Sequence, residues 1–264
     1  MANANTIRFS CTSLQGTNKK GILTKDEHGY YSQPIGGLNV MNSAGMYYTY
    51  QGAKNLFEES SAFMRRVRRG ALRGENGHPK RGERQSMDEF ASRILTIDES
   101  RICVHWRDIS LDFNNYKDQN GQPIVAIIGS FTPSGELGYV VEQAINNGFE
   151  NSCFSIRSFT EDYYVRNVLN RDIKTIITFD YVNEPGIAHA EKYKSLTLES
   201  YQDAVMTRSQ LERAANRQTL QLGMESAYLT GQELMEAFNW KPGTSIATES
   251  NGIIMPNKPS YLNW

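Results

Sequence analysis

The nine residues Lys174-Thr-Ile-Ile-Thr-Phe-Asp-Tyr-Val182 carry the clearest strand signal in the 264-residue chain. β-branched and aromatic side chains dominate this stretch, as is typical of a strand that packs on a hydrophobic core. Three upstream stretches have the same character, at residues 102–106, 123–129 and 149–159. We expect all four to be strands that build most of the core of one domain.

Helical patterns alternate with these strands. In residues 52–67 and 135–147, apolar side chains recur at the spacing of one helix face. Residues 68–85 are polar and rich in glycine, which predicts a loop, whereas Ile94-Leu-Thr-Ile97 reads as a further strand. Strands mixed with a few helices predict the α+β class.

The composition of the chain changes after about residue 190. Residues 198–238 are rich in Glu, Gln, Arg, Leu and Met, which predicts one or two helices. Residues 240–264 contain several Pro, Gly and Asn residues and predict an extended tail. We therefore divide the chain into a core, residues 1–195, and a helical appendage with a flexible tail, residues 196–264.

The overall composition narrows the possible functions. With 28 basic and 29 acidic residues, the chain has no net field that would favour nucleic acid or an acidic membrane. No run approaches about 20 apolar residues, and the first residues lack the pattern of a secretory signal, so we expect the protein to remain where it is made. The three cysteines form no Cys-x-x-Cys pair. No ligand cluster has metal-binding spacing, and we expect neither a metal nor an organic cofactor.

Two short segments carry residues that could do chemistry. His78 lies in Gly74-Glu-Asn-Gly-His-Pro79, where the proline favours an extended backbone at the histidine. Ser155 and Arg157 lie two residues apart in an apolar strand and therefore share a face. A hydroxyl beside a cation suits acyl transfer, because the hydroxyl attacks and positive or amide donors stabilise the oxyanion. Taken singly, each segment has an ordinary interpretation, as a loop histidine and a solvated strand serine.

Taken together, these segments resemble a known family. Residues 74–79 are similar to the Gly-Glu-x-Asn-His-Pro motif of T4-like phage prohead proteases, and residues 148–157 to their Gly-x-x-x-Gly-Val-Ser-Ser-Arg segment. Residues 179–185 resemble the family's Val-Asp-Ala-Val-x-x-Pro strand. The likeness spans roughly residues 30–190. Since this family is itself similar to the herpesvirus assemblins, it implies a herpesvirus-protease-like β-barrel surrounded by helices.

The resemblance implies a serine endopeptidase and assigns its residues. Ser155 would attack the scissile carbonyl, and His78 would take the proton and return it to the leaving amine. Asp180 would hold the imidazole, and Arg157 would support the oxyanion. Alternatives remain open, namely Ser152 or Ser158 as the nucleophile and Asp98 or Asp108 as the carboxylate.

The chain departs from the family pattern within the serine segment. Cys153 and Ser158 stand where the family has glycines. Because glycine adopts positive φ more readily than other residues, the backbone around the oxyanion is expected to differ in detail from that of the family. The choice of Ser155 as the nucleophile is unaffected.

The resemblance also implies substrates. Family members cut after glutamate with a small or apolar residue two positions earlier, and such triplets end here at Glu225 and Glu249. Both lie beyond residue 195, so we expect self-cleavage there, besides cleavage of capsid and scaffold or core proteins. The work would take place inside the phage procapsid, in the bacterial host cytoplasm. A homo-oligomer is compatible with the sequence, and neither a membrane nor a nucleic acid is expected as a partner.

Two non-enzymatic functions compete with this interpretation. Residues 65–84 contain eight cations against two acidic residues, which could form a nucleic-acid patch. However, aromatic residues that could stack on bases are not interleaved with these cations. A virion structural protein with a related barrel is the other alternative, but it would need neither the His-Pro loop nor the Ser-x-Arg strand.

Overall fold

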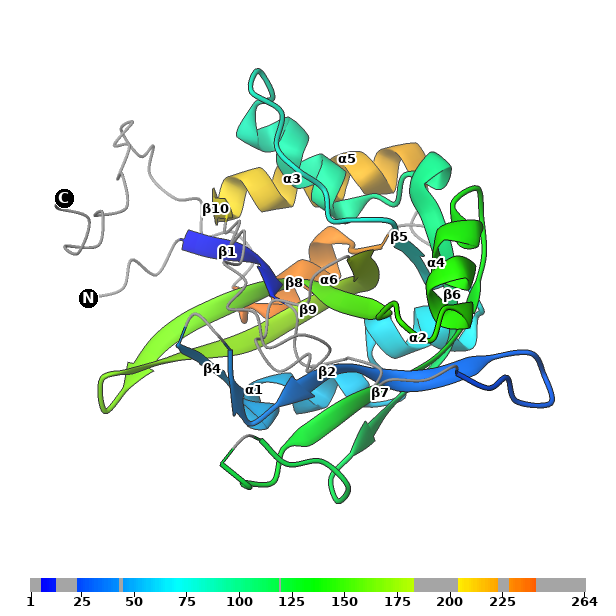
Figure 1. Cartoon of the computed structure of the whole chain (residues 1–264). Helices are drawn as coiled ribbons and strands as arrows, with labels where there is room; N and C mark the ends of the chain where they lie inside the picture. Colours follow the sequence, from blue (N-terminus) through cyan, green and yellow to red (C-terminus); the bar gives the residue numbers. More distant parts are fainter. Residues whose placement is uncertain are drawn as a thin grey trace, which may run out of the picture.

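Two β-sheets form the body of the protein (Figure 1). The computed structural model describes residues 6–12, 23–42, 45–118, 120–182, 204–222 and 228–240. The first sheet has the strand order β10 (Ala204–Thr207), β1 (Thr6–Thr12), β8 (Cys153–Val165), β9 (Val168–Val182), β4 (Met46–Tyr48) and β3 (Val40–Met41). The second has the order β2 (Tyr31–Leu38), β7 (Val125–Pro133), β6 (Ile102–Asp112) and β5 (Arg73–Glu75). Together with the helices that pack on these sheets, they confirm the predicted α+β class.

The β8–β9 hairpin is the longest strand pair and contains the stretch 174–182. Its two-residue turn places Arg166 and Asn167 at positive φ, of 48° and 65°, as tight hairpin turns that follow the twist of the strands require. The pairing sets Ser155 directly opposite Asp180. Directly opposed residues of an antiparallel pair have their side chains on the same face of the sheet.

The main core lies between the two sheets and is centred on Trp106 of β6. Its ring meets Phe131, Phe154 and Phe179 at centroid distances of 4.8–5.9 Å, mostly edge to face. The indole Nε1 donates a hydrogen bond of 3.1 Å to the carbonyl of Phe179. Since Phe154 and Phe179 come from the first sheet, this cluster joins the two layers and holds β9 in place.

The predicted single helix over residues 52–67 is interrupted. It consists of α1 (Tyr50–Ala53), a 3₁₀ turn η1 (Lys54–Phe57) and α2 (Ala62–Arg68). The chain is extended at Glu58, and the hydroxyl of Ser61 caps the new helix by accepting from the N–H of Met64. A capping serine competes with continuation of a helix, which explains the break.

The expected strand at residues 94–97 is wrong, because its first half belongs to α3 (Met87–Leu95). Ser86 and Glu89 form a capping box at the start of this helix. A run of apolar residues as short as this one does not distinguish a strand from the end of a helix. The predicted loop over residues 68–85 also contains the short strand β5. The remaining core helix, α4 (Gly138–Asn146), lies within the predicted range 135–147.

The expected barrel is not closed, since the described strands form two separate open sheets. The two sheets come together beside β5 and β9, where a single bridge joins Asn76 to Tyr181. Gly74 permits this approach, because a Cβ there would lie 2.2 Å from the Phe179 carbonyl oxygen. One bridge in place of a hydrogen-bonded ladder leaves the sheets distinct.

The described residues beyond 195 pack on the rest of the protein. β10 pairs with β1, and α5 (Arg208–Leu222) lies along α3 (Figure 1). α6 (Gly231–Ala237) packs on the same side, and its Leu234 joins an apolar cluster with buried side chains of α3 and α5. No helix in the described part of the chain is long and apolar enough to cross a membrane. The division of the chain at residue 195 stays a prediction.

Candidate active site

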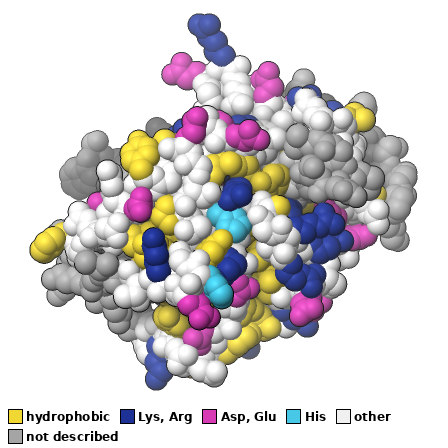
Figure 2. Space-filling view, turned by 90° about the vertical axis from the view of Figure 1, so that its right-hand side faces the viewer, with side chains coloured by type: hydrophobic (Ala, Val, Ile, Leu, Met, Phe, Trp, Pro, Cys, Tyr) yellow, Lys and Arg dark blue, Asp and Glu magenta, His cyan; other side chains and the backbone are white. Residues whose placement is uncertain are grey.

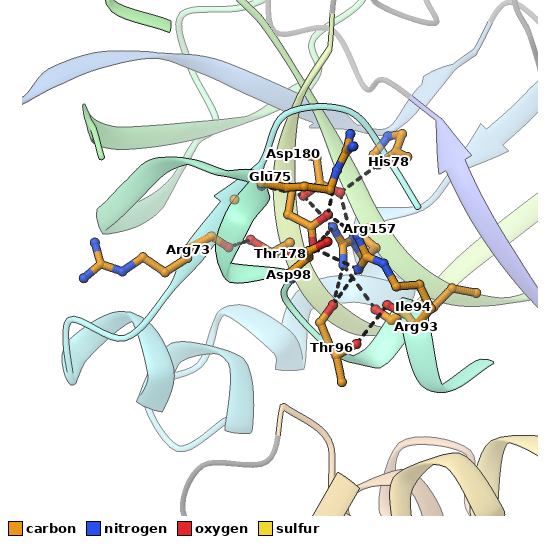
Figure 3. Close-up of polar contacts among 12 residues, drawn as sticks. Arg73, Glu75, His78, Arg93, Ile94, Thr96, Asp98, Arg157, Thr178 and Asp180 are labelled. Atoms are coloured by element: carbon orange, nitrogen blue, oxygen red, sulfur yellow. Dashed lines mark hydrogen bonds and ion pairs between the residues drawn. The ribbon is translucent and has the colours of Figure 1, made fainter. Parts of the chain in front are cut away.

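The loop that leaves β5 brings His78 against β9. Gly77 adopts a φ of +79°, and its N–H donates a hydrogen bond of 2.7 Å to the Tyr181 carbonyl. The next residue, His78, thereby faces Asp180, as Figure 3 shows. Glycine at position 77 suits this conformation, which other residues adopt with strain.

His78 and Asp180 form a hydrogen-bonded pair. The imidazole Nδ1 lies 2.8 Å from Oδ2 of Asp180. An ionised carboxylate can only accept, so in the neutral ring Nδ1 carries the proton and Nε2 keeps its lone pair. The arrangement leaves Nε2 ready to accept a proton from another group.

Ser155 completes the arrangement from β8. It lies opposite Asp180 in the hairpin register, and its side chain is buried. Within the described residues, neither the hydroxyl of Ser155 nor Nε2 of His78 has a hydrogen-bond partner, although both atoms are buried. Buried polar atoms without partners are uncommon and often mark sites where a substrate or reaction supplies the missing contact.

Arg157 holds the Asp180 carboxylate from the same strand as Ser155. Its Nε and Nη2 each lie 2.8 Å from one carboxylate oxygen, and both side chains are fully buried. Burial alone would raise the pKa of Asp180, but the charge of Arg157 and the hydrogen bond from His78 outweigh it and lower the pKa to about 2. Asp180 is therefore ionised across the physiological pH range.

This lowered pKa predicts how stability depends on pH. The folded protein favours ionised Asp180 more than the unfolded chain does, since its ordinary pKa is 3.8. The contribution, about 2 kcal/mol, is fully present above pH 4 and is lost as the pH falls toward 2. In urea unfolding, the free energy of unfolding of the wild type should fall by about 2 kcal/mol between pH 5 and pH 2 relative to that of Asp180→Asn, which lacks the titrating carboxylate. A difference between the two proteins that does not change between pH 5 and pH 2 would contradict the assignment.

A second buried carboxylate, Glu75, lies behind this group (Figure 3). It accepts from both terminal nitrogens of Arg93, at 2.9 and 2.5 Å, and lies 3.2 Å from Nη2 of Arg157. Its own N–H donates to Oδ1 of Asp180 at 3.0 Å. The sequence places Glu75 within the histidine motif, at Gly74–Pro79, but no role was predicted for it. Its position in that motif was the one feature of the sequence that could have indicated a role.

The alternative residues are engaged elsewhere or point away. The Asp98 carboxylate accepts from Ser100 at the start of a 3₁₀ turn, and Asp108 is exposed on β6. The hydroxyl of Ser152 donates to the side chain of Gln33 at 2.7 Å. Ser158 is buried, and its hydroxyl has no partner among the described residues, but it lies opposite Ile176 rather than a carboxylate. Of the three candidate carboxylates, Asp180 is the one bonded to His78. The two predicted self-cleavage residues, Glu225 and Glu249, fall outside the described residues.

Several cations of the basic cluster at residues 65–84 have structural partners. Arg65 pairs with Glu233 at 2.6 Å, and Arg68 lies 3.4 Å from Glu59. Arg66 is half-buried and donates to the carbonyl of Ile176 at 2.7 Å. On the face shown in Figure 2, basic side chains gather to one side, with acidic side chains among them. These contacts favour a structural use of the cluster over a continuous nucleic-acid patch. Within the described ranges, no three His, Cys, Asp or Glu side chains come together as metal ligands.

Comparison with known proteins agrees with the motif resemblance. Residues 9–236 match the Peptidase S80 family. The capsid maturation protease of Pseudomonas phage phiKZ is 35% identical over 246 residues, which cover 89% of this chain and 89% of the relative. Among solved structures, the capsid assembly protease of bacteriophage T4 aligns with 12% identity and a TM-score of 0.36, covering 67% of this chain and 97% of that one. The resemblance to phage prohead proteases is thus confirmed, and the chain belongs to the Peptidase S80 family.

Proposed function

We propose that the protein is a serine endopeptidase that cleaves capsid and scaffold or core proteins as the phage procapsid matures. The family and the name of the phiKZ relative support proteolysis of capsid proteins. One observation supports the serine mechanism above all. The bonded pair His78–Asp180 stands beside Ser155, and the two atoms that would exchange a proton lack partners in the described part of the chain.

In the proposed mechanism, the Ser155 hydroxyl attacks the scissile carbonyl while Nε2 of His78 takes its proton. The imidazolium, stabilised by Asp180, then protonates the leaving amine, and water hydrolyses the acyl-enzyme by the reverse proton path. Ser155 and His78 do not hydrogen-bond each other in this structure. Such contacts are often long without substrate and tighten when it binds.

We expect backbone N–H groups of the serine segment, and not the side chain of Arg157, to stabilise the oxyanion. The Arg157 guanidinium makes five contacts with acceptors: two with Asp180, one with Glu75, and one each with the carbonyls of Ile94 and Thr96, at 3.3 and 3.0 Å. The side chain is also fully buried. Arg157 therefore has no free donor for the oxyanion, and its side chain suits a positioning role.

The substrate preference and the barrel relation belong to the same proposal. Cleavage after glutamate, including self-cleavage at Glu225 and Glu249, is expected from the family resemblance. Two contacts between the sheets support a relation to the assemblin barrel: the Asn76–Tyr181 bridge, and the hydrogen bond of 2.9 Å from the Gln33 side chain to the Ser152 carbonyl. These are the places where the two sheets would join into one barrel.

Incubation with the capsid protein of the same phage tests the function. The wild type should cut it after glutamate, whereas Ser155→Ala should leave it intact, because the nucleophile is missing. Ser158→Ala is the matched control, since Ser158 is a buried serine of the same strand, and it should retain cleavage. Cleavage by Ser155→Ala, with termini identical to those made by the wild type, would sink the serine assignment.

A further inference from the structure

We propose that Glu75 is a positioning residue of the active site, acting on the His78–Asp180 pair through Arg157. This inference rests on the proposed function and assigns the buried carboxylate that the triad itself does not use. Glu75 bonds Asp180 through its backbone and Arg157 through its side chain, and it lies three residues before His78. Glu75 thus contacts Asp180 and Arg157 directly, and the chain continues from it to His78.

The contacts form a continuous row whose three central members, Asp180, Arg157 and Glu75, are fully buried. His78 bonds Asp180, Asp180 is bound by Arg157 at two points, Arg157 reaches Glu75, and Glu75 is bound by Arg93 at two points. Figure 3 shows these side chains gathered in one cluster around Arg157. A two-point contact between a guanidinium and a carboxylate fixes orientation as well as distance. Rotation of Asp180 away from His78 would therefore break contacts along the row.

The charges explain why a second carboxylate is needed. Arg157, Arg93 and Arg101 surround the group, and Arg101 Nε lies 3.6 Å from Glu75. These three cations face two carboxylates, Asp180 and Glu75. If Glu75 were neutral, three cations would face one carboxylate, and the imidazolium that forms during attack would meet a more positive surrounding. Such charges act strongly in a buried site.

The C-terminal end of α3 and the residues just after it hold Arg157 and Glu75 in place. Arg157 Nη1 donates to the carbonyls of Ile94 and Thr96, and the N–H of Asp98 donates to Glu75 at 2.9 Å. α5 supports the C-terminal end of α3, because the side chain of Gln218 donates to the Leu95 carbonyl at 2.7 Å. The positions of Arg157 and Glu75 are thus tied to the packing of α3.

A fluorophosphonate probe measures the effect without a known substrate, since the activated serine displaces fluoride. Glu75→Gln should label about 10- to 100-fold more slowly than the wild type, by analogy with the range found when hydrogen-bond partners of metal ligands are removed. In the Asp180→Asn background, Glu75→Gln should slow labelling by a clearly smaller factor, because it acts largely through Asp180. A merely structural role would slow both backgrounds equally.

Asp162→Asn is the matched control. Asp162 forms a two-point pair with the fully buried Arg171 in the same hairpin, at 2.7 and 2.9 Å. It lies seven residues beyond Ser155, about 23 Å along the strand, so its loss should lower stability without slowing labelling. Glu75→Gln labelling at the wild-type rate, or slowing of Asp162→Asn by the same factor, would overturn the inference. If Glu75→Gln does not fold, Arg93→Gln carries the test: labelling at least about twofold slower supports the inference, and an unchanged rate overturns it.

Labelling of Ser155→Ala distinguishes failure of the proposed serine mechanism from failure of the proposed role of Glu75. If that variant is labelled as fast as the wild type, the proposed serine mechanism fails. If it is not labelled while Glu75→Gln reacts normally, the mechanism stands and only the role of Glu75 fails.

Discussion

Replacement of His78 by alanine is expected to lower kcat/KM about 10⁶-fold, because the nucleophile loses the base that takes its proton. The side chain makes one hydrogen bond, to Asp180, and its Nε2 has no partner within the described residues. The variant should therefore fold, with a stability loss of about 1–3 kcal/mol from that single charged hydrogen bond. Rates on the capsid protein and thermal unfolding of the same samples measure both effects.

The double variant His78→Ala with Ser155→Ala sharpens this result. Since base and nucleophile act as one unit, the double variant should be no slower than either single variant. His105→Ala is the control, because His105 sits on β6 and bonds Tyr30 and the Gly70 carbonyl, both at 3.0 Å, outside the proposed site. Normal cleavage by His78→Ala, or an equal loss in His105→Ala, would show that another group serves as the base.

Motif order predicted His78, Ser155 and Asp180 as the site residues, but their geometry depends on bulges that no sequence pattern revealed. His78 and Asp180 lie 102 residues apart in the chain. Counted back from the Val165–Val168 pair without interruption, Ser155 would face residue 178 (165 + 168 − 155 = 178). Two irregularities, after Arg157 and after Phe159, move its partner to Asp180. A shift of two residues leaves each side chain on the same face of the sheet. Ser155 and Asp180 therefore share a face with or without the two irregularities.

The elements that sequence patterns missed are those defined by tertiary contacts. β5 has three residues and forms because Gly74 allows it to lie against β9 and β6. Glu75 looked like an ordinary loop carboxylate, and its burial depends on arginines from β8 and α3. By contrast, the positions of the long strands and of α4 were predicted correctly, although the strand bounds differ, because their apolar patterns are visible within one window.

A chain truncated after residue 195 is expected not to fold. The described residues beyond that point supply buried side chains to the cluster that covers α3, including Met206, Leu211, Leu229, Leu234 and Phe238. Burial of each such side chain contributes about 1.5–3 kcal/mol, so their loss is on the order of 10 kcal/mol. That is comparable to the whole stability of an ordinary domain, about 5–15 kcal/mol. The truncation would also expose the apolar face of α3, whose end holds Arg157.

Truncation after Trp240 is the matched control, because it keeps every described residue. This chain should show the same unfolding temperature as the full-length protein and the same rate of labelling by the fluorophosphonate. The shorter chain should be insoluble or lack a cooperative transition. Should it instead unfold cooperatively and label at the full rate, residues 1–195 would be an independent protease core, as the change in composition near residue 190 predicts. The buried cluster under α5 and α6 would then be an accessory contact that folding does not require.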